Sequence, residues 1–395
     1  MRELFRRREV RLYLTGQVFS LFGDTSLWLA AGIWVKQLTH SDAAAGMTYF
    51  FFALPALFAP AFGLLVDRVP RQRLLIMVNL FGAGVVLLLL AVSGPGQVWL
   101  IYAVMVLYGC CEILVGAGQQ ALLGSVVPGR LLADTNALLR TIRESMRIIA
   151  PLAGAAMFSL VGGGFVAVVD ALTFLVAAWC IVRMRVPELP LPRSQRSLRT
   201  ELVAGMRFLR VRGDLWRLTV AAGIAMIVFG FTESAVYAVI DHGLHRPPPF
   251  FGVLATVQGI GSVVGGLSSA VLLRRRSEPW LVAVGLGACA FGATCYVLPN
   301  VGVVLLGAAA FGVGLPWIVV GAVTLLQRSA PDELQGRVYT AFDVATTVPQ
   351  TISIALGAAM ITILGYQVLL AIETAVLLLS VALIARIRPA ARAAA

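Results

Sequence analysis

The sequence predicts an all-α membrane protein in which about twelve transmembrane helices form two pseudosymmetric six-helix bundles. Three observations predict this fold: the composition, the recurrence of long apolar runs and an internal repeat. Of the 395 residues, 59% are hydrophobic and only 13% are charged, whereas soluble domains carry roughly 25% charged residues. A soluble globule cannot bury that much apolar surface, and disorder needs the opposite composition. The composition therefore indicates an integral membrane protein.

Apolar runs long enough to cross a bilayer recur along the whole chain. A spanning helix needs about 20 largely apolar residues, and each run here is bounded by charged residues, Gly or Pro. The predicted spans are 11–38, 46–66, 73–93, 98–127, 137–161, 164–183, 215–240, 250–273, 279–298, 301–327, 337–362 and 365–386.

The positions of the basic residues predict the orientation. Of the 31 Lys and Arg residues, only Lys36 and Arg246 lie in loops on one side. The others lie on the opposite side or in the adjoining helix turns, so the positive-inside rule places both termini in the cytoplasm. This bias indicates an even number of spans. It also explains the net charge of +12 without nucleic acid as a partner.

One long polar segment separates the two groups of spans. We predict an N-terminal bundle over 1–183, a cytoplasmic linker over 184–214 and a C-terminal bundle over 215–395. Within the linker, Leu202 and Leu209 alternate with arginines such as Arg207. This pattern predicts an amphipathic helix on the anionic cytoplasmic leaflet.

An internal repeat relates the two halves. Residues 121–157 align without a gap to residues 324–360, so that Pro128 falls on Pro331. The same offset places Asp170 on Glu373. Parallel repeats of six helices are the architecture of a large transporter fold, whose substrate site lies between the halves near the midplane.

The segment between the second and third spans carries a recognisable motif. It reads Gly63-Leu-Leu-Val-Asp67-Arg68-Val-Pro-Arg71-Gln-Arg73. A Gly, three residues, Asp-Arg and a basic cluster at this place resemble the signature of the major facilitator superfamily. Further stretches, at 20–24, 128–154, 202–209 and 331–338, resemble the branch that contains macrolide-efflux and enterobactin exporters.

This resemblance implies a transporter of a bacterial cytoplasmic membrane that works by alternating access. We expect proton-driven export of amphipathic, cationic small molecules, with the proton gradient as energy source and no cofactor. Alternatives are export of a siderophore, another dedicated metabolite or a lipid, and a membrane receptor without transport activity. The expected partners are a small-molecule substrate and the lipid bilayer, and the expected state is a monomer.

Other classes of function lack their motifs. The sequence contains no ATP-binding loop of the Gly-x4-Gly-Lys-Ser/Thr type. Its five cysteines show no metal spacing, so no metal site is predicted. No nucleophile–base pair at catalytic spacing stands out, and we therefore do not expect an enzyme.

Carboxylates inside predicted spans are the first candidates for function, because an ionisable group in a bilayer costs about 2.5–3.5 kcal/mol. Asp24, Glu112 and Glu233 lie in spans one, four and seven, which the resemblance places around the central cavity. Each has an aromatic residue at helical spacing on the same face. Such a pairing suits a lipophilic cation, and in low dielectric a carboxylate can exchange that cation for a proton. The aromatic candidates are Trp28, Tyr108, Phe229, Tyr237 and, in span ten, Trp317.

Each carboxylate also has a structural interpretation. Glu112 could pair with Arg143 or Arg147 of the neighbouring span. Asp24 could hydrogen-bond with Thr25 or Ser26 and pack span one. Glu233 lies toward the outer end of its span and could reach water.

Two further carboxylates, Asp170 and Glu373, are repeat-related. They lie in spans six and twelve, which the resemblance places outside the cavity. We expect them to be peripheral and structural.

Charged residues at the cytoplasmic ends predict a conformational latch. Asp67 can accept hydrogen bonds from a helix N-terminus and pair with arginines, holding the halves together in the outward-facing state. Alternatively, the arginines only enforce topology, or attract an anionic substrate. The latch and gate candidates are Gly63, Asp67, Arg68, Arg71, Arg73, Arg140, Arg143, Arg147, Gly336, Arg337 and Asp343.

Overall fold

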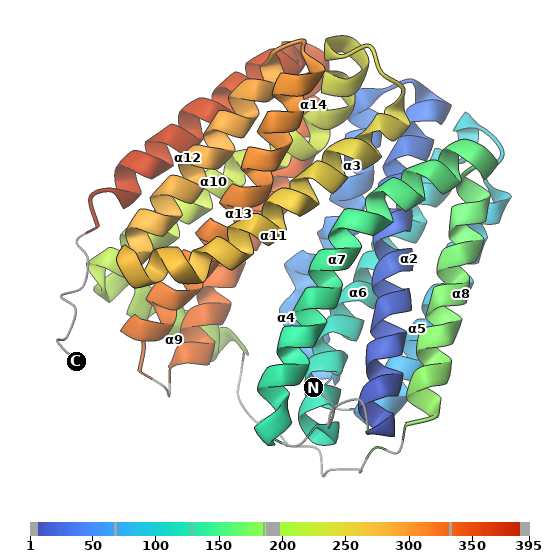
Figure 1. The fold of residues 1–395 in the computed structure, drawn as a ribbon, viewed down its shortest axis with the longest axis horizontal. Coiled ribbons are helices and arrows are strands. Elements are labelled where there is room, and N and C mark those ends of the chain that lie inside the picture. Colours follow the sequence, from blue (N-terminus) through green and yellow to red (C-terminus); the bar gives the residue numbers. More distant parts are fainter. Residues whose placement is uncertain are drawn as a thin grey trace. The chain divides into compact units, whose positions relative to one another are not determined.

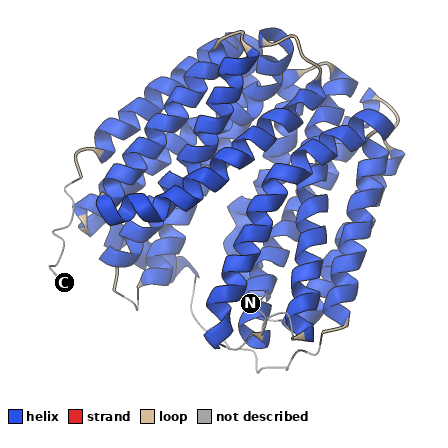
Figure 2. Cartoon of the chain, viewed as in Figure 1, coloured by secondary structure: helices blue, strands red, loops and turns tan. Residues whose placement is uncertain are grey.

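A computed structural model describes residues 7–66, 69–127, 129–184, 186, 198–331 and 334–387. All regular structure within these ranges is helical, as Figure 2 shows. The predicted all-α class is therefore confirmed for the described part of the chain.

The chain divides into two compact units. Unit 1 comprises Met1–Gln195 together with the short segment Pro248–Thr256. Unit 2 comprises Arg196–Pro247 and Val257–Ala395.

Unit 1 is built from long helices that pack on one another through small residues. Helix α2 packs against α3, α7 and α8, and α5 packs against α6 and α8. At one end of the unit, Val10, Leu75 and Leu122 belong to a buried apolar cluster. The elements, which Figure 1 shows, are α2 (Arg8–Thr39), α3 (Asp42–Ala53), η1 (Leu54–Phe58), α4 (Ala59–Val66), α5 (Arg71–Leu87), η2 (Leu88–Ala91), η3 (Pro95–Gln97), α6 (Val98–Val126), α7 (Gly129–Val161), α8 (Gly163–Val182) and η5 (Pro248–Phe250).

The second predicted span, 46–66, is not one continuous helix. It is divided into α3, η1 and α4, with Pro55 in the first turn of η1. Proline has no backbone N–H and clashes with the preceding turn, which breaks the α-helical hydrogen-bond ladder. The tighter 3₁₀ turn accommodates the break.

Unit 2 contains the second series of helices. Helix α10 packs against α14, and α12 packs against α13 and α14. The elements are α9 (Leu198–Val211), α10 (Gly213–Ala238), the π-helical turn η4 (Val239–Gly243), α11 (Phe251–Arg275, whose first residues belong to unit 1), α12 (Glu278–Val297), α13 (Val301–Ser329) and α14 (Gln335–Ile384).

Helix α14 consists of two helices that meet at Gly365. This residue has φ 73° and ψ 160°, a conformation that is essentially restricted to glycine. The break falls at the first residue of the last predicted span, 365–386, shortly after the end of the predicted span 337–362. Among the described residues, ten helices, with α14 taken as one, are long and apolar enough to cross a membrane.

The predicted amphipathic linker helix is α9. Its apolar face packs on α14 rather than facing outward as a whole: Leu209 is fully buried, and Gly205 lies against the backbone carbonyl of Arg337. Only a glycine permits so close an approach between two backbones. The opposite side of the helix exposes Arg207 and Arg210.

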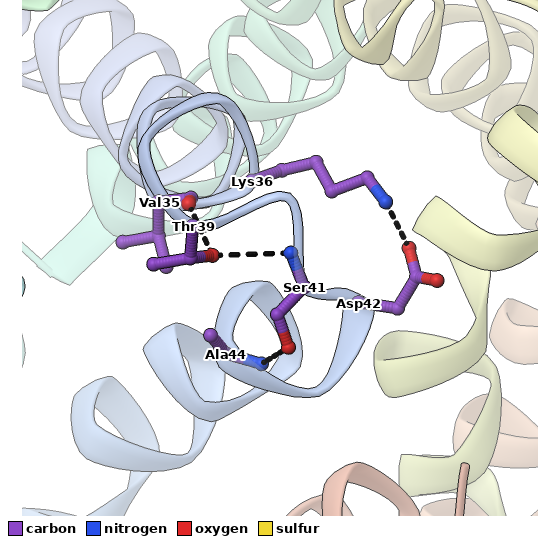
Figure 3. Close-up of polar contacts among 6 residues, drawn as sticks. All are labelled: Val35, Lys36, Thr39, Ser41, Asp42 and Ala44. Atoms are coloured by element: carbon purple, nitrogen blue, oxygen red, sulfur yellow. Dashed lines mark hydrogen bonds and ion pairs between the residues drawn. The ribbon is translucent and has the colours of Figure 1, made fainter. Parts of the chain in front are cut away.

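The connection between α2 and α3 is a compact polar corner, shown in Figure 3. Lys36 Nζ lies 2.8 Å from Asp42 Oδ1. The Thr39 hydroxyl donates to the Val35 carbonyl, and Ser41 Oγ accepts from the backbone N–H three residues later. The prediction that Lys36 lies in a loop is wrong: it belongs to the last turn of α2 and is buried, because the helix C-terminus and Asp42 both favour a cation there.

Candidate functional site

Asp24 of α2 lies at the centre of a hydrogen-bonded group in unit 1. The Ser20 hydroxyl, one turn earlier, donates to Asp24 Oδ2 at 2.9 Å. The Tyr108 hydroxyl from α6 donates to Asp24 Oδ1 at 2.7 Å. Tyr108 is buried, and its ring contacts that of Phe174 on α8. The structure thus brings together two predicted site residues from different helices.

Two more carboxylates interact electrostatically with Asp24: Glu112 of α6 and Asp170 of α8. Asp170 is fully buried. The Thr173 hydroxyl lies 3.2 Å from its Oδ1, whereas its Oδ2 has no hydrogen-bond partner among the described residues. We refer to Asp24, Glu112 and Asp170 as the carboxylate cluster.

The expectation that Asp170 is peripheral is wrong, and Gly23 supplies the physical reason. A side chain at position 23 would collide with Thr173 Oγ1 and Asp170 Oδ1. Because glycine has no side chain, α8 approaches α2 closely at this level and places Asp170 beside Asp24.

Asp24 and Glu112 differ in whether they interact with the structural partners expected from the sequence. Asp24 does not use its chain neighbours as expected, since the Ser26 hydroxyl donates instead to the Ala150 carbonyl of α7 at 3.2 Å. Glu112 is attracted electrostatically by Arg143 of α7. One of the two predicted arginine partners of Glu112 therefore acts on it.

Unit 2 also contains two carboxylates that interact. Glu373 of α14 is fully buried, and the expectation that it lies outside the central cavity stays a prediction. The Thr232 hydroxyl lies 2.9 and 2.8 Å from its two carboxylate oxygens, and Glu233 of α10 interacts with it electrostatically. The repeat-related residues Asp170 and Glu373 thus each face the first membrane helix of their own unit.

The two units differ in the aromatic residue beside the pair. At the repeat offset, Phe311 of α13 occupies the place of Tyr108. Its ring lies 6.1 Å from that of Phe229 and 5.8 Å from that of Tyr296. Phe311 has no hydroxyl and cannot donate a hydrogen bond to Glu233, which is partly exposed. The hydrogen-bonded arrangement around Asp24 is therefore not repeated by Phe311.

The remaining predicted aromatic residues lie in separate surroundings. Trp28 stacks obliquely on Tyr49, with ring centroids 4.6 Å apart. Tyr237 is buried. Trp317 donates its indole N–H to Ser268 Oγ of α11 at 2.9 Å, a contact that orients the ring.

The predicted latch and gate residues fall into three sets. Asp67 and Arg68 lie outside the described residues, whereas Gly63 lies in α4 and Arg71 and Arg73 begin α5. On α7, Arg140, Arg143 and Arg147 are exposed, and Arg147 pairs with Glu144 at 3.8 Å. At the start of α14, Gly336 and Asp343 are exposed and Arg337 is partly buried.

One residue near the signature motif was missed by the sequence reasoning. The Gln72 side chain donates to the carbonyls of Ile181, at 2.8 Å, and Met184, at 3.0 Å. These bonds tie the start of α5 to the end of α8. A polar residue within the basic cluster was the only available signal.

Comparison with known proteins identifies relatives over nearly the whole chain. A model of the Major Facilitator Superfamily matches residues 13–244 and 230–395. The chain is 22% identical over 334 residues to Macrolide efflux protein A of Streptococcus pyogenes, with 82% of each chain covered. It is 23% identical over 384 residues to the MFS-type transporter YfiS of Bacillus subtilis, which covers 92% of this chain and 89% of that protein.

Solved structures share the fold. The nucleoside transporter NupG matches with a TM-score of 0.76 and 13% identity, over 97% of this chain and 100% of that one. A bacterial homologue of the iron transporter ferroportin, in its inward-facing state, matches with a TM-score of 0.73 and 16% identity, over 96% and 98%. At these identities the likeness shows the fold alone.

Proposed function

Because this chain belongs to the Major Facilitator Superfamily and is a transporter rather than an enzyme, we propose that it is a proton-coupled exporter of amphipathic, cationic small molecules. Relatives named for macrolide efflux favour antibiotics of that class as the first substrates to test. The proton gradient would supply the energy, without a cofactor.

The carboxylate cluster is the observation that supports this proposal most strongly. Asp24, Glu112 and Asp170 come from three helices and interact within one partly buried region. Carboxylates gathered in low dielectric need compensating positive charge, which either protons or a cation can supply. Competition between the two is sufficient for antiport. Glu233, beside Glu373, is the corresponding candidate in unit 2.

We also propose that the chain crosses the membrane about twelve times. The broken segment 42–66 taken as one span, and α14 taken as two at Gly365, bring the predicted number of spans to about twelve. With both termini in the cytoplasm of a bacterium, the chain would work as a monomer by alternating access, the mechanism expected of this fold.

Proton release on substrate binding tests the proposal. Erythromycin, tetraphenylphosphonium and the anionic siderophore enterobactin are each added to the purified protein in weakly buffered detergent, with a pH dye present. We expect the two cations to release protons, and we expect Asp24→Asn to abolish the release. Asp134→Asn, which removes an exposed carboxylate on α7, is the matched control and should release protons normally.

Other outcomes would redirect the proposal. Saturable binding of enterobactin without proton release by any cation would contradict the cation site and favour the arginines of α7 as an anion site. Cation binding without substrate-dependent proton movement in vesicles would favour a receptor. Comparison of Glu112→Gln and Glu233→Gln would show which unit carries the coupled proton.

A further inference from the structure

The ends of α2 and α8 line an open cavity of about 430 Å³ within unit 1. We propose that this cavity binds the headgroup of an anionic phospholipid, with an acyl chain lying along the adjoining faces of the two helices. The proposal rests on the membrane location of the chain and is independent of the exporter's substrate.

The charge of the cavity suits an anion. Arg8 and Arg11 of α2 and Arg183 of α8 line it, and no Asp or Glu is among its lining residues in the described part of the chain. All three arginines are exposed. The planar guanidinium group matches a phosphate through paired hydrogen bonds, so three of them around one cavity form a suitable phosphate site.

An aromatic residue marks the boundary between the charged and apolar parts of this surface. The Arg183 guanidinium lies 5.3 Å from the centre of the Trp179 ring. Trp179 is 55% exposed although its neighbour Cys180 is buried. Tryptophan is enriched where the hydrocarbon of a bilayer meets the headgroups, which is the level at which a phosphate would sit.

On α8, exposed apolar side chains continue from the cavity along one face. Leu172, Leu175, Trp179 and Val182 are 44–56% exposed and recur at intervals of three and four residues, so they share one side of the helix. The face therefore changes from apolar at Leu172 to charged at Arg183.

Helix α2 also changes from charged to apolar side chains with increasing distance from the cavity. Arg8, Arg11, Thr15 and Phe19 follow one another at helical spacing, and Phe19 is 44% exposed. The helices are antiparallel, because Gly16 lies against Ala177 and Cys180 whereas Gly23 lies against Asp170 and Thr173. Both helices thus present cations at one end and apolar side chains beside it.

This combination distinguishes a lipid from a soluble anion. Free phosphate could bind the arginines, but it would make no contact with the exposed apolar side chains of α8 and α2. Basic pockets between membrane helices, close to the headgroup level, are suited to anionic lipid headgroups. The proposed ligand is therefore a phospholipid with a net negative headgroup, such as phosphatidylglycerol.

Native mass spectrometry of the full chain in detergent tests the site. The protein is titrated with phosphatidylglycerol and, separately, with phosphatidylcholine that has the same acyl chains. We expect tighter binding of phosphatidylglycerol, and we expect the triple variant Arg8→Gln/Arg11→Gln/Arg183→Gln to weaken it by about tenfold or more. The matched control is Arg274→Gln/Arg275→Gln/Arg276→Gln, which removes the same charge from exposed residues at the end of α11 and directly after it and should leave the affinity nearly unchanged.

Fluorescence locates the lipid independently. Phosphatidylglycerol with brominated acyl chains should quench a component of the emission that disappears in Trp179→Phe, and the triple variant should lose that quenching. The triple variant must elute as the native species on size exclusion, which is expected because the three arginines are exposed. Equal affinity for both lipids, equal weakening by the two triple variants, or full competition by inorganic phosphate would each overturn the proposal.

Discussion

Single side chains determine the environment of the Asp24 carboxylate. Ser20 and Tyr108 each donate one hydrogen bond to it, and Glu112 and Asp170 lie close enough to interact with it electrostatically. A hydrogen bond to a charged group contributes about 1.5–3 kcal/mol, more than one between neutral groups. The hydroxyl of Tyr108 is therefore expected to influence proton exchange as well as packing.

Tyr108→Phe should change the coupling between substrate and proton. The ring, and its contact with Phe174, would remain, while the bond to Asp24 would be lost. Because that bond favours the ionised form of Asp24, its loss should raise the substrate concentration needed for half-maximal proton release, measured with the pH dye. The control is Tyr102→Phe, which removes a hydroxyl bonded to the backbone carbonyl of Ala44; it should lower the melting temperature slightly and leave the coupling unchanged. Identical coupling in both variants would contradict a role for the Tyr108 hydroxyl.

Lys36, the only lysine of the chain, should matter for stability through Asp42. Its side chain is 5% exposed and that of Asp42 is 13% exposed. Removal of one partner from a buried ion pair costs about 3–5 kcal/mol, because the remaining charge loses an opposite charge close to it. Lys36→Met should therefore lower the melting temperature in detergent markedly. Lys36→Met/Asp42→Asn should recover part of the loss, and no recovery would argue against the pair as the cause.

At the scale of elements, small residues set the distances between helices. Gly154 of α7 contacts Ser26 of α2, and the repeat-related Gly357 of α14 contacts Ser234 and Phe231 of α10. The two units therefore use glycines at the same repeat position for the same packing. In membranes, helix association relies on such close packing.

Gly154→Ala should destabilise the protein by about 1–3 kcal/mol through overpacking. An added Cβ would lie 2.8 Å from Ser26 Cα and 2.9 Å from its carbonyl oxygen, and a backbone cannot move aside as a side-chain tip can. Gly84→Ala on α5 is the matched control, since a Cβ there meets nothing within 4 Å. Thermal unfolding of the two variants should differ clearly in this order, and equal stabilities would refute the packing argument.

At the scale of the whole molecule, the distribution of charge determines the expected orientation. The basic residues lie overwhelmingly on one side of the predicted topology, and such a bias directs that side to the cytoplasm. Both termini are then expected on the same side, in agreement with the even number of spans predicted.

Fusion reporters at the termini test this orientation. Green fluorescent protein fused to the C-terminus should fluoresce in intact bacteria, because both termini are expected in the cytoplasm. Alkaline phosphatase fused at the same point should be inactive, and its fusion after Arg246 should be active. Activity of the C-terminal phosphatase fusion would contradict the expected orientation.

Several features were predictable from the sequence because the bilayer acts on local properties. The length of an apolar run decides whether it spans, the flanking charges decide its orientation, and the internal repeat and the motif around Gly63 indicate the family. Asp24, Glu112 and Tyr108 could be selected for the same reason, since an ionisable or hydroxyl group inside an apolar run is costly wherever it packs.

Only the tertiary structure decided which of these residues meet. Helical spacing relates side chains on one helix, and it paired Asp24 with Trp28, whereas the hydrogen bond to Asp24 comes from Tyr108 on another helix. Asp170 was expected at the periphery, yet the missing side chain of Gly23 lets α8 approach α2 and brings this carboxylate beside Asp24. The partners of a buried charge depend on how closely helices approach each other, and that distance is a property of the packed bundle rather than of any single run of residues.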